Sequence, residues 1–265
     1  MRFDILTTFP EMFDAERGAL AHSIPARARA AGLAEWHATN IRDFADNKHE
    51  KTDDRPFGGG PGMVMTCQPL WDAAIAAEAL DERPTTRVLL TPQGEPLTQR
   101  IMEEFATKPR LLLICGHYEG IDERVVGRLA LREVSVGDYV LSSGELGAMV
   151  LMDAVIRLLP GVLGDEASAA QDSFSPVPRA TPNGDPIPAK LLAAWCDDLG
   201  ITPDARLLDC PHYTRPRDWE GREVPAELLS GDHLAVARWR LERMVERTQA
   251  RRPDLLDGLS GAMDR

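Results

Sequence analysis

The chain has 265 residues, of which 43% are apolar and 6% aromatic, and a net charge of −12. This length suits one ordinary domain followed by a smaller one, with enough aliphatic side chains for a core that needs no disulfides. No segment has the length of a membrane span, and the N-terminus lacks the features of a signal peptide. We therefore expect a cytoplasmic protein without a membrane partner.

Residues 1–160 alternate short β-prone segments with helical patterns, which predicts an α/β domain with a parallel sheet. The final helix is almost wholly apolar and is expected to be buried on most sides. The predicted strands are Arg2–Thr8, Ala34–Asn40, Arg87–Thr91, Arg110–Cys115 and Leu131–Val136, and the predicted helices are Pro69–Leu80, Thr98–Thr107, Ile121–Ala130 and Glu145–Leu159.

After Gly161 the composition changes to small, polar and proline-rich residues, which predicts an interdomain linker over residues 161–206. A short helix, Ala189–Leu199, is expected within it. Residues 207–265 then form a second, mostly helical domain.

One helix of this second domain has an arginine-rich face. Residues 236–252 contain six arginines and two glutamates, whereas the chain as a whole is acidic. Acidity argues against a nucleic-acid partner, but a local basic patch can still bind phosphates. Two interpretations stay open here: a solvated face with intrahelical ion pairs, or an RNA-binding surface.

Three glycine-bearing loops, residues 91–94, 115–120 and 136–145, follow predicted strands. Loops at the carboxyl ends of parallel strands meet at one edge of the sheet, so their convergence predicts a ligand pocket. A fourth segment, residues 53–63, is too rich in glycine for a helix or strand interior. It fits neither the dinucleotide fingerprint nor the Walker pattern, which disfavours a dinucleotide oxidoreductase and a nucleotide hydrolase.

These loops belong to a series of ordered motifs that spans nearly the whole chain: FPEMF (9–13), DDRPFGGGPGM (53–63), TPQG (91–94), CGHYEGIDERV (115–125), VGDYVLSSGE (136–145), PGVLGDEASAAQDSF (160–174), LLDCPHYTRP (207–216) and RRPDLL (251–256). With these motifs the sequence closely resembles the bacterial tRNA (guanine-N1-)-methyltransferase family, TrmD, of the SPOUT superfamily. The resemblance implies a parallel α/β domain with a deep C-terminal trefoil knot, a small helical tRNA-binding domain, and a homodimer.

The resemblance further implies methyl transfer from S-adenosyl-L-methionine to N1 of guanine at position 37 of tRNA, in the anticodon stem-loop, supported by Mg²⁺. The alternative is another SPOUT RNA methyltransferase that acts on a different base or on a ribose. Glu119, Arg157 and Asp172 match the functional triad of the family, with Asp172, supplied by the other subunit, as the base that removes the N1 proton. Positions that match cofactor-binding residues are Leu90, Gly116, Gly120, Val136, Gly137, Asp138, Tyr139, Val140, Leu141 and Gly144. No metal ligand is assigned.

Each of these residues also has an ordinary interpretation. Asp172 resembles a solvated or turn-capping aspartate, Arg157 a residue that interacts with the helix dipole, and Glu119 a loop carboxylate. Asp53 and Asp54 are equally suited to loop capping and to contact with RNA. Cys210 and His212 lack further ligands in sequence and are more typical of a structural role.

The chain also departs from its relatives. Residues 175–206 are an insertion, and Ser143, Leu89 and Gly147 stand where the family commonly has glycine, tyrosine and proline. A catalytically idle cofactor-binding or RNA-binding protein is the remaining rival from another class. The intact triad argues against it.

Overall fold

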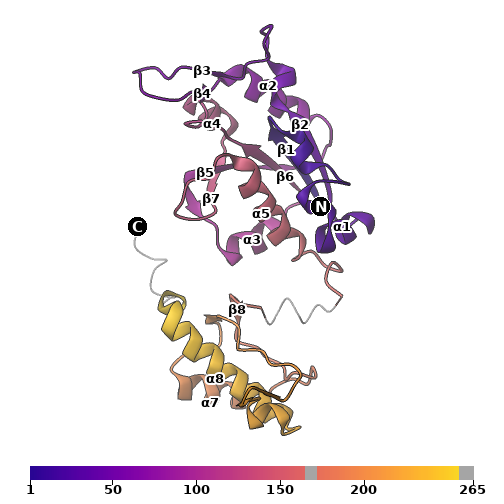
Figure 1. Cartoon of the computed structure of the whole chain (residues 1–265), viewed down its shortest axis with the longest axis vertical. Coiled ribbons are helices and arrows are strands. Elements are labelled where there is room, and N and C mark those ends of the chain that lie inside the picture. The colour runs from indigo at the N-terminus through magenta and orange to yellow at the C-terminus, as the bar shows by residue number, and fades with distance from the viewer. Residues whose placement is uncertain (165–171, 257–265) are drawn as a thin grey trace. The chain divides into compact units, whose positions relative to one another are not determined.

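The computed structural model describes residues 1–164 and 172–256, in two compact units, Met1–Gly164 and Asp165–Arg265. The first unit is built on a five-stranded sheet in the order β2-β1-β6-β5-β7, and every pairing in it is parallel (Figure 1). The strands are β1 (Arg2–Thr7), β2 (Glu35–Asn40), β5 (Thr85–Pro96), β6 (Arg110–Cys115) and β7 (Arg132–Ser135). The prediction of an α/β unit with a parallel sheet is confirmed.

Helices cover both faces of this sheet. They are α1 (Ser23–Ala30), α2 (Cys67–Glu78), α3 (Gln99–Ala106), α4 (Glu123–Leu129) and α5 (Gly144–Ile156), with single 3₁₀ turns at Pro10–Phe13, Ala19–Ala21 and Ile41–Phe44. Sequence patterning predicted all of these α-helices except α1, whose short, arginine-containing sequence has a weak apolar face.

Alternation along the strands produces two cores. Ile5, Leu111 and Leu113 face α1, α3 and α5 on one side of the sheet, whereas Leu6 and Leu112 face α2 and α4 on the other. Successive side chains of a strand point to opposite faces, so β1 and β6 supply both cores at once. Because helices cover both faces of the sheet, the residues that can contact a ligand lie at the ends of the strands.

One helix of the first unit, α5, has two exposed apolar side chains. α5 packs on β6 and on α3, but Leu146 and Val150, one turn apart, are 51% and 56% exposed. The expectation that this helix is buried on most sides is confirmed, and within a single copy of the chain the exposed residues form one narrow stripe that includes Leu146 and Val150.

The second unit has a small core of its own between α7 (Ala189–Leu199) and α8 (His233–Arg251). Its remaining elements are the two-stranded pairs β8 (Ser175–Pro176) with β9 (Arg206–Leu207) and β10 (Asp218–Trp219) with β11 (Arg222–Glu223), and the 3₁₀ turns Ala226–Leu229 and Pro253–Leu255. Val177, Ile187, Leu192 and Cys196, all within the expected insertion 175–206, are buried in this core. These residues thus pack as part of the second unit.

Candidate active site

A cavity of about 300 Å³ opens where the bulged stretch of β5 at residues 89–93 meets the loops that follow β6 and β7. The predicted loop 91–94 thus lies within β5, which runs to Pro96. The walls of the cavity are residues 89–93, 116–121, 134–136, 139–144 and Gly147. Of the residues expected to bind the cofactor, Leu90, Gly116, Gly120, Val136, Tyr139, Val140, Leu141 and Gly144 line it. Gly137 and Asp138 lie in the loop between two of these lining residues. The three glycine loops therefore meet as the sequence predicts.

Backbone crowding explains one glycine in these walls, Gly144, and one directly beside them, Gly94. A Cβ atom on Gly144 would lie 2.7 Å from Cα of Cys115 and 2.8 Å from the amide nitrogen of Gly116. A Cβ atom on Gly94 would lie 2.3 Å from the amide nitrogen of Val134, at the bulge where β5 shifts its register on β7. These loops approach each other too closely for any side chain.

The loop after β6 has an unusual backbone. Tyr118 adopts φ +58°, in the left-handed region that few residues other than glycine occupy, and Gly120 adopts φ +131°. Such conformations persist where the surroundings hold them, and they concentrate at functional sites. The loop presents Glu119 to the cavity wall.

The glycine-rich segment 53–63 packs against this same loop. It forms the hairpin β3 (Asp53–Asp54) to β4 (Val64–Met65), and the amide of Glu119 donates to the carbonyl oxygen of Met63 at 3.0 Å. Gly62 lies so close to Glu119 that its Cβ atom would come within 2.3 Å of Oε1. The segment, expected as a structured loop, thus forms one support of Glu119.

Beneath the cavity lies a buried acid that the sequence analysis did not select. Glu145, in the first turn of α5, is fully buried, and its Oε1 accepts hydrogen bonds from Oγ1 of Thr7 at 2.5 Å and Nε2 of His117 at 2.8 Å. Burial raises the pKa of Glu145, but hydrogen bonds from His117, Ser143 and Thr7 outweigh burial and leave the pKa below its ordinary value. The carboxylate is therefore charged and paired with the imidazole.

Both residues of this pair stand in motifs that the sequence analysis singled out. They are 28 positions apart, and nothing in a single sequence indicates that a histidine and a glutamate at this separation meet.

Arg157 lies at the opposite end of α5 from the cavity. It is the C-cap of this helix, and its amide donates to the carbonyl oxygen of Asp153. Thirteen residues separate it from Gly144, which corresponds to about 20 Å along a helix axis. Within one chain, Arg157 and the cavity are therefore not brought together.

Asp172 belongs to the second unit, where it lines a different cavity of about 260 Å³ between α7 and α8. The amide of Ser175 donates to its backbone carbonyl oxygen at 3.2 Å. Trp195, Asp209, His212 and Arg240 also line this cavity. Several of its walls come from residues 175–206, the segment expected as an insertion.

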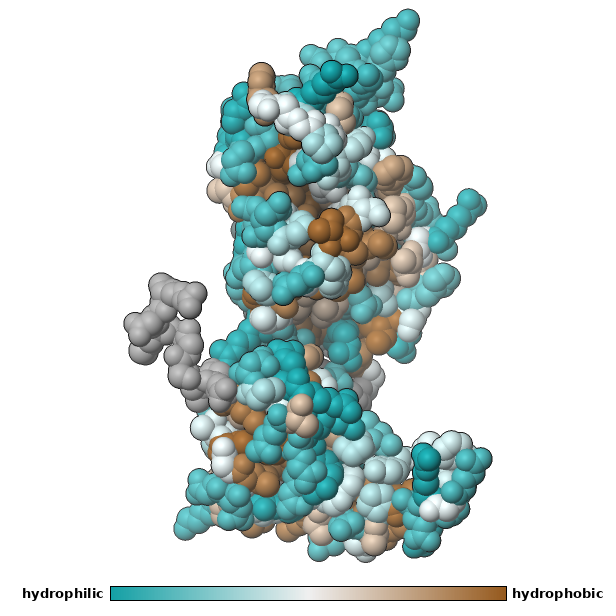
Figure 2. Space-filling view, turned by 60° about the vertical axis from the view of Figure 1, so that its left-hand side comes forward, coloured by the Kyte–Doolittle hydropathy of each residue, from teal (hydrophilic) through white to brown (hydrophobic). Residues whose placement is uncertain are grey.

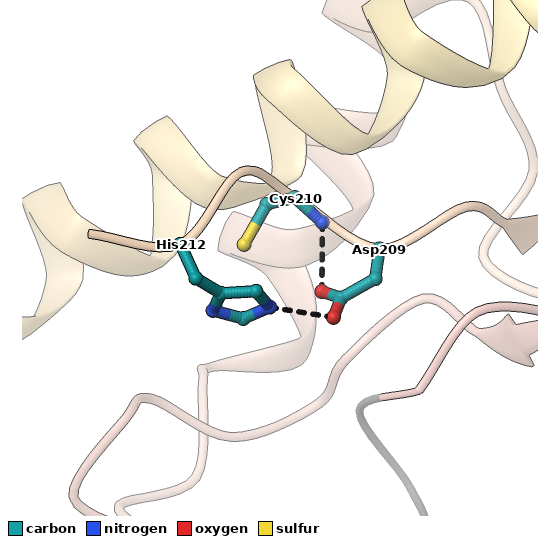
Figure 3. A group of neighbouring side chains, drawn as sticks. All are labelled: Asp209, Cys210 and His212. Carbon is teal, nitrogen blue, oxygen red and sulfur yellow. Dashed lines mark hydrogen bonds and ion pairs between the residues drawn. The ribbon is translucent and has the colours of Figure 1, made fainter. Parts of the chain in front are cut away.

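Figure 3 shows a side-chain cluster at this second cavity, formed by Asp209, Cys210 and His212. Nε2 of His212 lies 2.7 Å from Oδ2 of Asp209, and Oδ1 accepts the amide of Cys210 at 2.7 Å. Asp209 is thus the third polar side chain of this cluster. The sequence pattern pointed only to Cys210 and His212. The three donor atoms lie within 4.8 Å of one another, but the carboxylate already has two partners.

The arginine-rich face of α8 is partly engaged within the chain. Arg243 pairs with Glu246 at 2.6 Å, and Nη1 of Arg247 donates to the backbone oxygen of Asp209 at 2.9 Å. Arg251 is exposed, and Arg240 lines the cavity with Asp172. The interpretation as a face with intrachain pairs therefore holds for Arg243 and Arg247, while RNA binding by this face stays a prediction.

Comparison with known proteins decides the family. The family described as tRNA (guanine-1)-methyltransferase TrmD matches residues 1–185 and 197–258. The chain belongs to this family. The resemblance is confirmed over almost the whole chain. Residues 175–185 and 197–206 of the expected insertion also match the family, so the unmatched part of that segment is residues 186–196 alone.

Named relatives of this TrmD-family chain come from distant bacteria. A tRNA (guanine-N(1)-)-methyltransferase of Chloroflexus aurantiacus is 51% identical over 97% of the chain and 88% of the relative. Proteins of the same name from Rhodopirellula baltica and Geobacillus kaustophilus are 46% and 47% identical, over 97% of the chain and 94% and 92% of the relatives. Within the described part of the chain, no helix combines the length and apolarity needed to cross a bilayer.

Proposed function

We propose that this TrmD-family enzyme transfers the methyl group of S-adenosyl-L-methionine to N1 of guanine at position 37 of tRNA. The observation that carries the proposal is the cavity beside β5, β6 and β7, which the three family loops line with glycines, aliphatic side chains and a few polar and aromatic ones. A cavity with backbone donors and acceptors and an apolar wall suits an adenosine moiety. We infer the acceptor, a guanine in tRNA, from the names of the relatives.

Methyl transfer requires the protein to align the methyl donor with the acceptor nitrogen and to supply a base. The sulfonium methyl of the donor is already electrophilic, so the cavity has to hold it in line with the acceptor nitrogen and exclude water. Guanine N1 carries a proton, and its removal creates the nucleophile. In this proposal Asp172 accepts that proton, a general-base contribution of roughly 10²- to 10⁴-fold.

Arg157 and Glu119 complete the proposed machinery. The Arg157 guanidinium stabilises negative charge that builds on guanine O6 as N1 loses its proton. Glu119, which lines the cofactor cavity, holds the donor edge of guanine. The N1–methyl bond then forms as the sulfur–methyl bond breaks, and the N1 proton stays on Asp172.

A homodimer explains how Arg157 reaches the chemistry. Arg157 is about 20 Å along α5 from the cavity of its own chain, so a second copy has to supply it. The exposed apolar side chains Leu146 and Val150 on α5, together with Val140, form a face suited to that contact. Figure 2 shows apolar side chains gathered on the side of the first unit that bears β5 and β7.

Three further features belong to the same proposal. The loops after β6 and β7, joined by the bond from the Gly144 amide to the Gly116 carbonyl, are the segments expected to form the trefoil knot. Residues 207–265 bind the anticodon stem-loop, with Arg240 and Arg251 as phosphate contacts. Four free thiols suit the cytoplasm.

Mg²⁺ has no evident site among the described residues. Their one group of three close ligand side chains is Asp209, Cys210 and His212, and its sulfur and nitrogen atoms are poor donors for a cation that prefers oxygen. No step of the proposed reaction is assigned to the metal ion.

The function is tested with labelled S-adenosylmethionine and tRNA transcripts that carry guanine or adenine at position 37. We expect 1-methylguanosine in digests of the guanine transcript and no label in the other. A ribose-methylated nucleoside would favour the alternative SPOUT reaction, and label on the adenine transcript would refute the site.

The base is tested with Asp172→Asn, using Asp185→Asn, an exposed aspartate of the same unit, as the control. We expect the first variant to lose turnover while its affinity for S-adenosylmethionine stays within about twofold of wild type. Full turnover by Asp172→Asn would refute the assignment of the base.

A further inference from the structure

We propose that His117 is a positioning residue for the cofactor, and that it acts through its buried pairing with Glu145. This proposal rests on the proposed function, because it takes the cavity between β5, β6 and β7 as the site of S-adenosylmethionine. Neither residue belongs to the triad or to the positions that match cofactor contacts.

The pair joins two walls of the cavity and connects them to the end of β1. His117 stands in the loop after β6, between Gly116 and Gly120, and lines the cavity itself. Glu145 begins α5, directly after the lining residue Gly144. Thr7, at the end of β1, donates to the same carboxylate oxygen, and Oγ1 of Thr8 lies 3.2 Å from Nε2 of His117.

The hydrogen-bond pattern fixes the imidazole. An ionised carboxylate can only accept, so Nε2 of His117 carries a proton and donates it to Glu145. The backbone amide of His117 is also engaged, with Sδ of Met65 at 3.3 Å, and its ring packs 5.4 Å from the ring of Phe9. The His117 side chain is 11% exposed, so the pair is shielded from water and from salt.

The loop that His117 holds needs such a restraint. Tyr118 has φ +58° and Gly120 has φ +131°, conformations that a loop without support does not favour. If the pair is lost, the loop relaxes and the cofactor has to order it again on binding, which weakens affinity. The expected signature is therefore a higher KM and Kd for S-adenosylmethionine with little change in kcat.

Charge matters because Glu145 is buried. A protonated imidazole neutralises the carboxylate, whereas a neutral one leaves a buried negative charge with weaker compensation. The other titratable groups around the pair are Glu119 and Tyr118 on the same loop and Cys115 at the end of β6. Burial, together with the charge of Glu145, raises the pKa of the Cys115 thiol, which therefore stays protonated.

The experiment compares His117→Gln, which keeps a hydrogen-bond donor without charge, with His117→Arg, which keeps a permanent cation. Binding of S-adenosylmethionine is measured by calorimetry without RNA, and KM and kcat are measured with tRNA. His22→Gln, at an exposed histidine of the same unit, is the control. Thermal melts verify that each variant is folded.

We expect His117→Gln to raise Kd and KM about tenfold, the range for loss of a charged hydrogen bond, with kcat within about threefold. We expect His117→Arg, which keeps a donor toward Glu145, to bind within about threefold of wild type. Unchanged Kd in His117→Gln, or equal weakening in both folded variants, would overturn the proposal.

If His117→Gln fails to fold, Thr7→Val weakens the same carboxylate contact from β1 and is expected to raise Kd in the same direction. An unchanged Kd in that folded variant would also overturn the proposal. Absence of 1-methylguanosine from the wild-type reaction would instead refute the proposed function, while calorimetry with S-adenosylmethionine still tests the pair.

Discussion

The amide nitrogen of Gly144 donates a hydrogen bond to the carbonyl oxygen of Gly116, with 2.9 Å between the two atoms. This bond joins the start of α5 to the loop after β6, and both residues line the cavity assigned to the cofactor. Because the two backbones touch, the position of one loop sets the position of the other. The cavity is therefore sensitive to a single added carbon atom.

Gly144→Ala is expected to weaken binding of S-adenosylmethionine at least tenfold, because its Cβ atom would press on the backbone of Cys115 and Gly116. Gly147→Ala is the matched control: it lies one turn along α5, also lines the cavity, and its Cβ atom would meet Leu90 and Val136 at an ordinary 3.5 Å. Calorimetry on both variants checks this. Equal affinities would contradict the close approach.

Gly62→Ala is expected to lower kcat at least tenfold, because its Cβ atom would displace the carboxylate of Glu119. Gly59→Ala is the control that distinguishes the contact with Glu119 from backbone strain. Gly59 has nearly the same φ, +79° against +81°, so both alanines strain the backbone alike, but nothing lies within 4 Å of the Cβ atom at position 59. Steady-state rates with tRNA give the comparison, and similar losses in the two variants would assign the effect to backbone strain alone.

Arg110→Met is expected to destabilise the first unit by about 3 kcal/mol, because the buried Asp4 carboxylate keeps only its bonds to Arg2 and the carbonyl oxygens at the end of α2 lose their donor. Arg110 and Asp4 are both almost fully buried, with 2.6 Å between Nε and Oδ2, and the guanidinium also donates to carbonyl oxygens at the end of α2. Arg124→Met, which removes a 75% exposed arginine from its pair with Asp122, should cost at most about 1 kcal/mol. Urea unfolding of both variants measures the difference, and similar losses would argue against a buried ion pair.

Acid is expected to remove the contribution of Glu145 to stability. The pKa of Glu145 is lower in the folded chain than in the unfolded chain, so the charged group stabilises the fold above the unfolded value of about 4.3. That contribution disappears as pH falls through the lower, folded pKa. Urea midpoints of wild type should therefore drop more steeply below about pH 4 than those of Glu145→Gln. Glu16→Gln, at an exposed site, should follow wild type; a Glu145→Gln variant with the same slope would contradict the shift.

Local patterns predicted the secondary elements well where periodicity is strong. The span of β6 (Arg110–Cys115) agrees with the prediction because six consecutive buried residues leave little ambiguity. α7 (Ala189–Leu199) also agrees, since Pro188 precedes it and Gly200 ends it in a left-handed conformation. α1 was missed because its residues lack a clear apolar face, and tertiary contacts with α5 stabilise it.

The sequence by itself determined the class of fold, the family and the three glycine loops, because these depend on local periodicity and on motifs that are contiguous in the chain. Only the tertiary structure decided which distant residues meet: Glu145 with His117, Gly62 with Glu119, and Asp4 with Arg110. The tertiary structure also shows that Arg157 lies at the far end of α5 from the cavity of its own chain. Such pairings follow from how β1, β6 and α5 pack, and the spacing of residues along one chain carries no information about them.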